Sequence, residues 1–451
     1  MSNPPGTEFT ARFTTQWMPA ILILTTIGYY FAFMYQHAIN VPLADDIYDI
    51  LQVVSGVITA QDKESALQIL YAQHNDHRTF ASRLIYYGIY LIQGNIDFRT
   101  LVFLANLALP LLLGLLYLMA RNRGEKYLLL LPAALILFQL RAYGIILWSM
   151  AAFAYFYVFL YGFCCLCCLH QISRKRFVLA IFFASAATFT LASGQVVWLV
   201  GFISLLHQSL IRRSAPYFYT LCWAIAAAVV LVTWRLGLET PNTLLAMLTN
   251  FFNFPGHHVL YCLTLLGCAV TENSVALAAM AGMTMIAILV VSTVKSSRDE
   301  DLRLELCCWF VVLSVAAMVL GRSFTSVDYA LSSRYSFPSV LMLATTWVLV
   351  VVRLDIQSRK LLLLGGLLAA TYCVSSYYVY SKPLQYQAEK RVKNFNEDNY
   401  WAWPHPRRES NAIVAQAVSL GVYQPPSRPL PDPRIDSGGK KKDNSMKLER
   451  K

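Results

Sequence analysis

Long apolar runs separated by short polar segments set the pattern of this chain. Eleven of the runs approach the ~20 residues that a helix needs to cross a bilayer. The pattern predicts an all-α polytopic membrane protein with about 11 transmembrane helices, at residues 17–36, 101–120, 127–142, 147–169, 177–193, 196–211, 217–236, 276–294, 304–320, 337–352 and 361–379. Because no small-residue cleavage signal follows the first run, we expect it to be a retained signal-anchor helix.

Basic residues gather in the polar segments at one end of the predicted helices. With Arg12, these segments hold 15 Lys and Arg residues, at 121–126, 173–176, 212–213, 295–303 and 353–360. The segments at the opposite ends hold eight Lys and Arg residues and ten acidic residues. The positive-inside rule therefore predicts a cytoplasmic N-terminus and, with an odd number of spans, a C-terminus on the outer face.

Overall composition adds two exclusions. The formal charge is +12, but only 14% of residues are charged and 57% are hydrophobic. Much of the positive charge lies in short loops and in the tail "GGKKKDNSMKLERK", which indicates membrane orientation and argues against a nucleic-acid partner. The ten cysteines fall in or beside apolar runs, where they behave as small hydrophobic residues, so no disulfide framework is expected.

Three long polar segments and the C-terminal region define the outer side. The segments are 37–100, 237–275 and 321–336. We expect residues 1–380 to form the transmembrane domain, with 37–100 as its first outer loop. Residues 381–451, which include "YQPPSRPLPDPR", are predicted to form a partly flexible extension on the same face.

The first outer segment begins with an acidic cluster, in "NVPLADDIYDILQVV". Pro42 suits the first turn of a helix, so Asp45, Asp46 and Asp49 would lie in its early turns, with Asp45 and Asp49 on one face. A carboxylate here could act as general base for a hydroxyl acceptor or bind a divalent cation. Helix capping and solvation explain the same spacing equally well.

A second motif in this segment, "QHNDHR", combines imidazoles and a guanidinium. In an amphipathic juxtamembrane helix, His74, His77 and Arg78 would stand at i, i+3 and i+4 and share one face. That set suits a phosphate, because Arg presents a planar fork of donors. Zinc is less favoured, since the spacing is not i, i+4 and the guanidinium would repel the ion. A solvated helix that meets lipid phosphates is the plain alternative.

Further polar residues stand at the outer ends of predicted spans. A charge within hydrocarbon costs several kcal/mol, so such residues usually line a cavity or extend to the interface. The arginines among them are Arg141, Arg235, Arg322 and Arg334. Additional candidates for substrate binding are Tyr143, Glu272, Asp328 and Tyr335.

Together these features resemble the GT-C superfamily of integral membrane glycosyltransferases. The resemblance rests on an Asp-Asp pair after the first span, many further spans and outward-facing arginines, over about residues 15–380. "QHNDHR" and "SSRYSFPS" are similar to the HNEHR-like and SRY-like motifs of many bacterial members, although Asp76 stands where a Glu is expected.

The resemblance implies a sugar donor linked to polyprenyl phosphate or diphosphate. Transfer would take place on the periplasmic face of a bacterial inner membrane, with inversion at the anomeric carbon. Asp45 or Asp46 would be the catalytic base. His74, His77, Arg78, Arg334 and, more weakly, Arg322 would bind the donor phosphate. No cofactor is certain, but Asp45 and Asp46 could share Mg²⁺ or Mn²⁺.

The C-terminal extension is short compared with the soluble domains of oligosaccharyltransferases. This favours a monosaccharide transferase similar to the aminoarabinose, mannosyl or arabinofuranosyl transferases. The expected acceptor is a lipid, a glycan or a protein such as pilin, so a pilin arabinosyltransferase is one specific version. Donor, acceptor and membrane lipids would be the partners.

Three other classes remain as alternatives. A transporter or flippase should carry ionisable groups near mid-membrane and often shows internal repeats, and neither is found in the sequence. An O-antigen polymerase or ligase would use outer arginines without particular need of the Asp45–Asp46 pair. In a non-enzymatic lipid-binding scaffold, all these motifs would only contact the membrane interface and would have no catalytic role.

Overall fold

The computed structural model describes residues 17–120, 125–213, 216–239, 244–296, 301–322, 325–400 and 405–430. Helix makes up 78% of the structure, and the described part of the chain contains no strand. The expected all-α class is therefore confirmed.

Seven helices among the described residues are long and apolar enough to cross a membrane. They are α2 (Met18–His37), α6 with α7 (Phe98–Asn106 and Ala108–Ala120), α10 (Ser149–Leu169), α13 (Tyr217–Arg235), α16 (Val275–Lys295), α17 (Arg303–Leu320) and α19 (Arg359–Asn396). These helices support a membrane protein.

Helices also form at the other predicted spans, but they are shorter. These are α8 (Lys126–Leu137), α11 (Arg174–Thr188), α12 (Val196–Leu210) and α18 (Phe337–Arg353). α8, for example, ends at Leu137 and is followed by a non-helical stretch that the apolar pattern included in the span. The seven longer helices are therefore the membrane spans that length and apolarity support, and the count of eleven remains a prediction.

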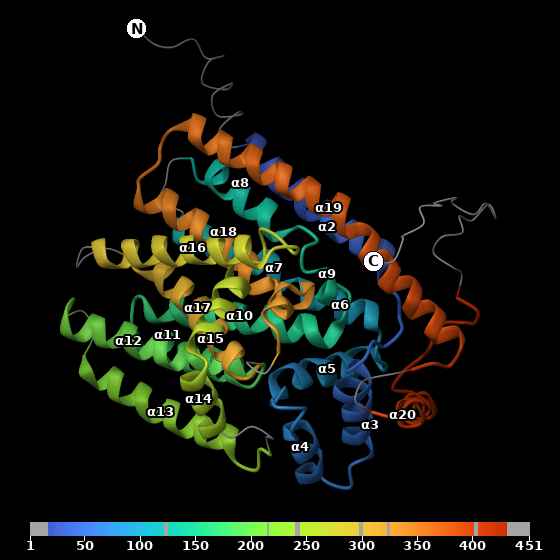
Figure 1. The fold of residues 1–451 in the computed structure, drawn as a ribbon. Helices are drawn as coiled ribbons and strands as arrows, with labels where there is room; N and C mark the ends of the chain where they lie inside the picture. The colour runs from blue at the N-terminus through green and yellow to red at the C-terminus, as the bar shows by residue number, and fades with distance from the viewer. Residues whose placement is uncertain are drawn as a thin grey trace.

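α19 is the longest helix and crosses the expected domain boundary at residue 380 without a break (Figure 1). It runs beside α2 along one side of the bundle, and α8 packs against both. α10 lies at the centre of the bundle and packs against α6, α7, α11, α12 and α17.

α15 (Pro255–Gly267) and α16 form the most closely packed helix pair. A Cβ atom at Gly267 would lie 1.8 Å from the carbonyl oxygen of Ala278, and one at Gly282 would lie 2.1 Å from that of Leu263. Small residues allow such close backbone approach where lipid gives little hydrophobic driving force between helices. The preceding α14 (Leu244–Asn253) leads into this pair.

The first outer segment folds into short helices at one end of the bundle. These are a π-helical turn η2 (Ile47–Leu51) continuous with α3 (Gln52–Thr59), then α4 (Lys63–Tyr71) and α5 (Phe80–Gln93). The C-terminal helix α20 (Arg407–Ser419) packs on η2 and α3. Tyr48 stacks on His405 at 3.8 Å between ring centroids, and its hydroxyl lies 3.2 Å from the Ser410 Oγ.

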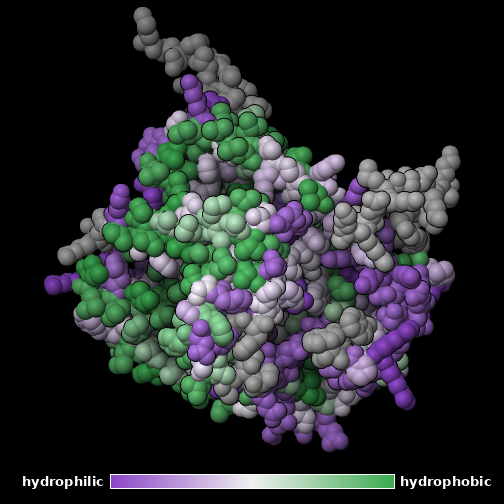
Figure 2. All heavy atoms as spheres, viewed as in Figure 1, coloured by the Kyte–Doolittle hydropathy of each residue, from purple (hydrophilic) through white to green (hydrophobic). Residues whose placement is uncertain are grey.

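The remaining elements are short and lie between the long helices. They are α9 (Tyr143–Ile146), η3 (Ala192–Gln195), η4 (Val327–Leu331) and η5 (Ser333–Tyr335). In Figure 2, hydrophilic side chains gather over the end that carries α3 and α20, and apolar side chains cover the side with α12, α13 and α16. One end of the molecule is thus suited to water, while the flank is suited to lipid.

Candidate functional site

The acidic cluster lies at the start of η2: Asp45 and Asp46 precede the helix, and Asp49 lies within it. Ala44 adopts a left-handed backbone (φ 48°), after which the carbonyl oxygen of Asp45 accepts hydrogen bonds from the main-chain N–H groups of Tyr48 and Asp49. The helix therefore begins at Ile47, and the expectation that Pro42 stands in its first turn is wrong. Because Pro42 lies before the left-handed turn at Ala44, it cannot share a helix with the aspartates.

The paired aspartates occupy different environments. Asp46 is fully buried and accepts hydrogen bonds from the main-chain N–H of Leu43 at 3.0 Å and of Met150 at 2.8 Å. Burial raises the pKa of Asp46 to about 7, against the opposing charge of Arg391 and these two hydrogen bonds. The side chain of Asp45 is 23% exposed, so Asp45 is the member of the pair that a substrate can reach.

Asp49 ties the acidic cluster to α5 through an ion pair and a hydrogen bond. It is fully buried and bonds to the Arg83 guanidinium at 2.8 Å and to the Thr79 hydroxyl at 2.7 Å. The sequence reasoning did not select Arg83, although a buried carboxylate requires a charged partner. The position of Arg83 on the apolar face of an amphipathic helix, α5, could have indicated a buried ion pair.

His74 lies between the carboxylates of Asp45, which precedes the helix, and Asp49, which lies within it. Its Nε2 is 3.9 Å from an Asp45 carboxylate oxygen, and its Nδ1 is 3.9 Å from an Asp49 oxygen. Burial lowers the pKa of His74, but the charges of Asp49 and Asp45 raise it by more, so the net pKa lies above the ordinary value. His74 therefore belongs to the acidic cluster.

The "QHNDHR" segment is a tight turn, and the expectation of a helix there is wrong. His74 and His77 exchange two main-chain hydrogen bonds, at 2.9 and 3.0 Å, and Asn75 has a left-handed backbone (φ 50°). Asn tolerates this conformation better than most residues, which favours a turn over a continued helix. Consequently His74, His77 and Arg78 do not share one helix face.

Arg78 is fully engaged in holding the turn to the bundle. It is 3% exposed, and its guanidinium donates to the carbonyl oxygens of Trp234, Tyr71 and Leu236. The Arg78 guanidinium also lies over the ring of Tyr71, 4.1 Å from its centroid. These contacts argue for a structural role, because the donors that a phosphate would need already bind main-chain oxygens.

A basic cluster follows α17 at the same end of the bundle. The guanidinium groups of Arg322 and Arg334 both donate to the hydroxyl of Tyr335 and lie over its ring, 4.3 and 4.8 Å from the centroid. Neither has an ion-pair partner among the residues that the structure describes. Two cations that converge without a carboxylate form a site suited to an anion.

His77 connects the two clusters. Burial and the neighbouring charge of Arg322 lower the pKa of His77 to about 4, so its ring is neutral at pH 7. Since His77 is tied to His74 by the turn, the basic cluster adjoins the acidic cluster. His77 can therefore contribute a hydrogen bond to an anion there, without adding a charge.

Close packing fixes the position of Arg334. A Cβ atom at Gly144, in α9, would lie 2.6 Å from the Ser333 Oγ and 3.1 Å from the main-chain nitrogen of Arg334. The hydroxyl of Ser336 donates to the carbonyl oxygen of Arg141 at 3.2 Å. The "SSRYS" segment thus lies directly on the loop that contains α9.

The remaining candidates have varied surroundings. Arg141 is fully buried and donates to the carbonyl oxygens of Cys268 and Leu331, with Glu272 3.8 Å away. Tyr143 stacks on Tyr380, 5.6 Å between centroids. Asp328 is exposed. Only Tyr335 joins the basic cluster directly, and the described residues contain no group of three or more metal-ligating side chains placed to hold an ion.

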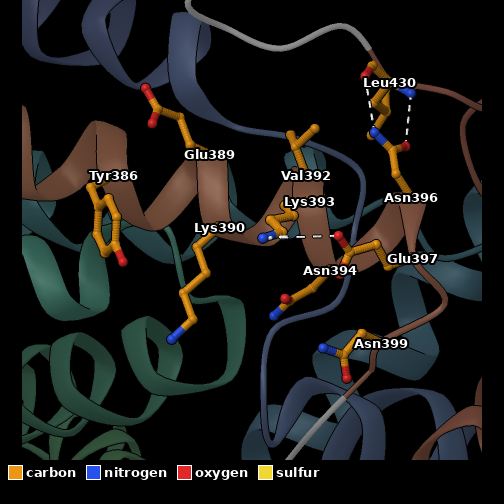
Figure 3. A pocket seen from close by; sticks show the side chains of 10 residues that line it. All are labelled: Tyr386, Glu389, Lys390, Val392, Lys393, Asn394, Asn396, Glu397, Asn399 and Leu430. Atoms are coloured by element: carbon orange, nitrogen blue, oxygen red, sulfur yellow. Dashed lines mark hydrogen bonds and ion pairs between the residues drawn. The ribbon is translucent and has the colours of Figure 1, made fainter.

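A polar groove of about 630 Å³ follows the C-terminal half of α19 (Figure 3). Tyr386, Lys390 and Asn394 line it from the helix, and Asn399 lies next to Asn394. A smaller pocket shares both asparagines and continues to Ala44, the neighbour of Asp45. The groove therefore leads toward the acidic cluster.

Comparison with protein-family models, with curated proteins and with solved structures finds no match to this chain.

Proposed function

We propose that this protein is a membrane glycosyltransferase of the GT-C type. It would transfer a sugar from a polyprenyl-phosphate donor to an acceptor hydroxyl on the outer face of a bacterial inner membrane. One observation carries the proposal: a partly exposed carboxylate, Asp45, lies beside His74, and His77 of the same turn lies near Arg322, which meets Arg334 at Tyr335. Among the described residues, neither arginine has a carboxylate partner.

In the proposed reaction, Asp45 accepts the proton of the acceptor hydroxyl as that oxygen attacks the anomeric carbon. The bond between this carbon and the phosphate oxygen breaks on the opposite side of the sugar, which inverts the configuration. The released phosphate carries the negative charge, and Arg322 and Arg334 stabilise it. A positioned general base typically contributes about 10²–10⁴ in rate.

The surroundings of the two aspartates favour Asp45 as the base. Asp46 is enclosed, and its carboxylate already accepts two main-chain hydrogen bonds. Asp45 has open surface and one neighbouring imidazole, His74, whose raised pKa favours the charged form beside the carboxylate. The imidazole would hold the Asp45 carboxylate in position for the acceptor.

The donor and acceptor would reach the site from different directions. A polyprenyl chain partitions into the bilayer, so the donor phosphate would enter at the membrane interface near Arg322 and Arg334. The groove along α19 adjoins the smaller pocket that reaches the Asp45 loop, and it offers amide and amine groups to a polar acceptor. The acceptor is a lipid, a glycan or a protein, and the donor sugar is open among monosaccharides.

A transfer assay in membranes tests the proposal with a panel of labelled polyprenyl-phosphate sugars. We expect Asp45→Asn to lower the transfer rate by about 100-fold or more. Asp76→Asn is the matched control, because Asp76 is exposed in the neighbouring turn and lies outside the acidic cluster, and it should leave the rate unchanged. Full activity of a normally folded Asp45→Asn protein would overturn the mechanism.

A further inference from the structure

Arg391 lies in the C-terminal half of α19, beyond residue 380, where the sequence predicted a partly flexible extension. It is buried, with 5% of its surface exposed. Its guanidinium donates to the carbonyl oxygen of Leu147 at 2.9 Å and to that of Val41. Val41 precedes the acidic cluster and Leu147 precedes α10. One buried side chain therefore joins three segments that lie far apart in the chain.

Asp46 holds two of the same segments together. Its carboxylate accepts hydrogen bonds from the main-chain N–H groups of Leu43, before η2, and of Met150, in the first turn of α10. Burial raises the pKa of Asp46, and the charge of Arg391 is the strongest influence that opposes this rise. Arg391 and Asp46 thus act on one junction, between the residues before η2 and the start of α10.

The position of the Asp45 carboxylate depends on this main chain. Asp45 follows Ala44, whose left-handed backbone (φ 48°) costs free energy in a residue that carries a Cβ atom. Such a conformation persists only when the surrounding contacts hold it. The Asp45 carboxylate itself lies 3.9 Å from His74, beyond the length of a hydrogen bond. Contacts of the main chain therefore set its position.

The C-terminal region also contacts the chain on both sides of this loop. Before the loop, the hydroxyl of Tyr423 donates to the carbonyl oxygen of Asn40 at 2.8 Å. After the loop, the ring of Tyr48 stacks on that of His405. Arg391 contacts the residues between these two points. The C-terminal region thus supports the loop along its whole length.

We propose that Arg391 is a positioning residue for glycosyl transfer. Its hydrogen bond to Val41 holds the main chain of residues 41–46 so that the Asp45 carboxylate meets the acceptor hydroxyl. Arg391 touches neither the acceptor nor the donor phosphate, and it moves no proton. The inference rests on the proposed function, because Asp45 is the base through which Arg391 acts.

Arg391→Gln removes the guanidinium, and two controls separate its local effect from general ones. Leu362→Ala shortens a buried side chain at the opposite end of α19, so it lowers stability without reaching the loop. Lys382→Gln removes a charge from an exposed residue of the same helix, outside the groove of Figure 3. Hydrogen–deuterium exchange over residues 40–48 reports on the main chain directly. We expect it to rise in Arg391→Gln and to remain at the wild-type level in both controls.

The transfer assay measures what the loop position contributes to the reaction. We expect Arg391→Gln to lower kcat by about 10- to 100-fold, because a small misplacement of a reacting group can cost about 100-fold in rate. The affinity for polyprenyl phosphate should remain that of the wild type, since Arg322 and Arg334 are unchanged. In the Asp45→Asn background, Arg391→Gln should lower kcat no further, because the group that it positions is already absent.

Melting temperatures confirm that each variant is folded. Unchanged exchange over residues 40–48, or an unchanged kcat, in Arg391→Gln would overturn the positioning role. Equal losses of kcat with and without the Asp45 carboxylate would also overturn it, because Arg391 would then act independently of the base. Full activity of Asp45→Asn is a different result, which overturns the proposed function itself whatever the effect of Arg391→Gln.

Discussion

Two charged clusters adjoin at the polar end of the bundle, and they differ in how their charges are balanced. In the acidic cluster, Asp49 is paired with Arg83 and Asp46 accepts two main-chain hydrogen bonds. In the basic cluster, Arg322 and Arg334 meet at a neutral hydroxyl, that of Tyr335. The buried aspartates of the first cluster have partners within the chain, whereas the second has no carboxylate partner among the described residues and would gain most from a bound anion.

This difference separates stability from binding. Removing one member of a buried ion pair leaves the other charge uncompensated, which destabilises the fold. Removing a partly exposed arginine that has no carboxylate partner leaves no such charge behind. The two clusters should therefore respond in opposite ways to the same kind of substitution.

The largest effect is expected from Arg83→Gln. Loss of the guanidinium leaves the buried Asp49 without its ion pair, so the free energy of unfolding should fall by about 3–5 kcal/mol. Thermal unfolding of purified protein measures the change. Arg99→Gln, on the same outer segment but outside both clusters, serves as the control. A melting temperature equal to that of Arg99→Gln would contradict the structural role of Arg83.

The second effect concerns the basic cluster. Arg322→Gln and Arg334→Gln should each weaken binding of a polyprenyl-phosphate donor by about 10- to 100-fold, since a hydrogen bond to a charged group contributes about 1.5–3 kcal/mol. Their melting temperatures should remain close to that of the wild type. A donor-binding assay with both variants checks this. Strong destabilisation with unchanged donor affinity would show that the basic cluster stabilises the fold and does not bind the donor.

The third effect is a pH dependence of stability that arises from Asp46. Its pKa is raised by burial to about 7 in the folded protein, above its unfolded value. A raised pKa stabilises the fold below the unfolded pKa, and this stability is lost as the pH rises through the folded pKa. Between about pH 5.5 and about pH 7 the loss should be about 2 kcal/mol.

Melting curves across this pH range, compared with Asp46→Asn, test that assignment. The variant should lose the part of the slope that Asp46 contributes, because Asn has no proton to release. His74 contributes in the same direction, since its pKa is also raised, so His74→Gln should flatten the curve further. An unchanged slope in Asp46→Asn would show that Asp46 is not the titrating group.

The smallest effect is expected from Tyr335→Phe. The ring that both guanidinium groups cover is retained, and only the hydroxyl that they share is lost. Donor affinity should fall by a few-fold, because a single hydrogen bond contributes about 1 kcal/mol. Tyr329→Phe, whose ring lies farther from Arg334 at 5.7 Å, is the control for the same binding measurement. A greater loss than in Arg334→Gln would place the hydroxyl itself on the ligand.

Much of the fold could be predicted because apolar runs of bilayer length have few alternatives to helix. The expected spans all contain helices. Asp45 and Asp49 both approach His74, but Asp45 lies before the helix that begins at Ile47, so the two do not share a helix face as the i, i+4 spacing predicted. The turn at 74–77 was missed, because the helical pattern on both sides hid a left-handed residue at Asn75.

The sequence by itself determined which charged residues lie at the polar end, since hydrocarbon excludes them wherever no partner is available. Only the tertiary structure decided their roles. Arg78 and Arg141 meet main-chain carbonyl oxygens, Arg83 meets a carboxylate, and Arg322 and Arg334 meet each other at Tyr335. The acceptors of a guanidinium come from segments far apart in the chain, so no local pattern can reveal which arginine is left for a ligand.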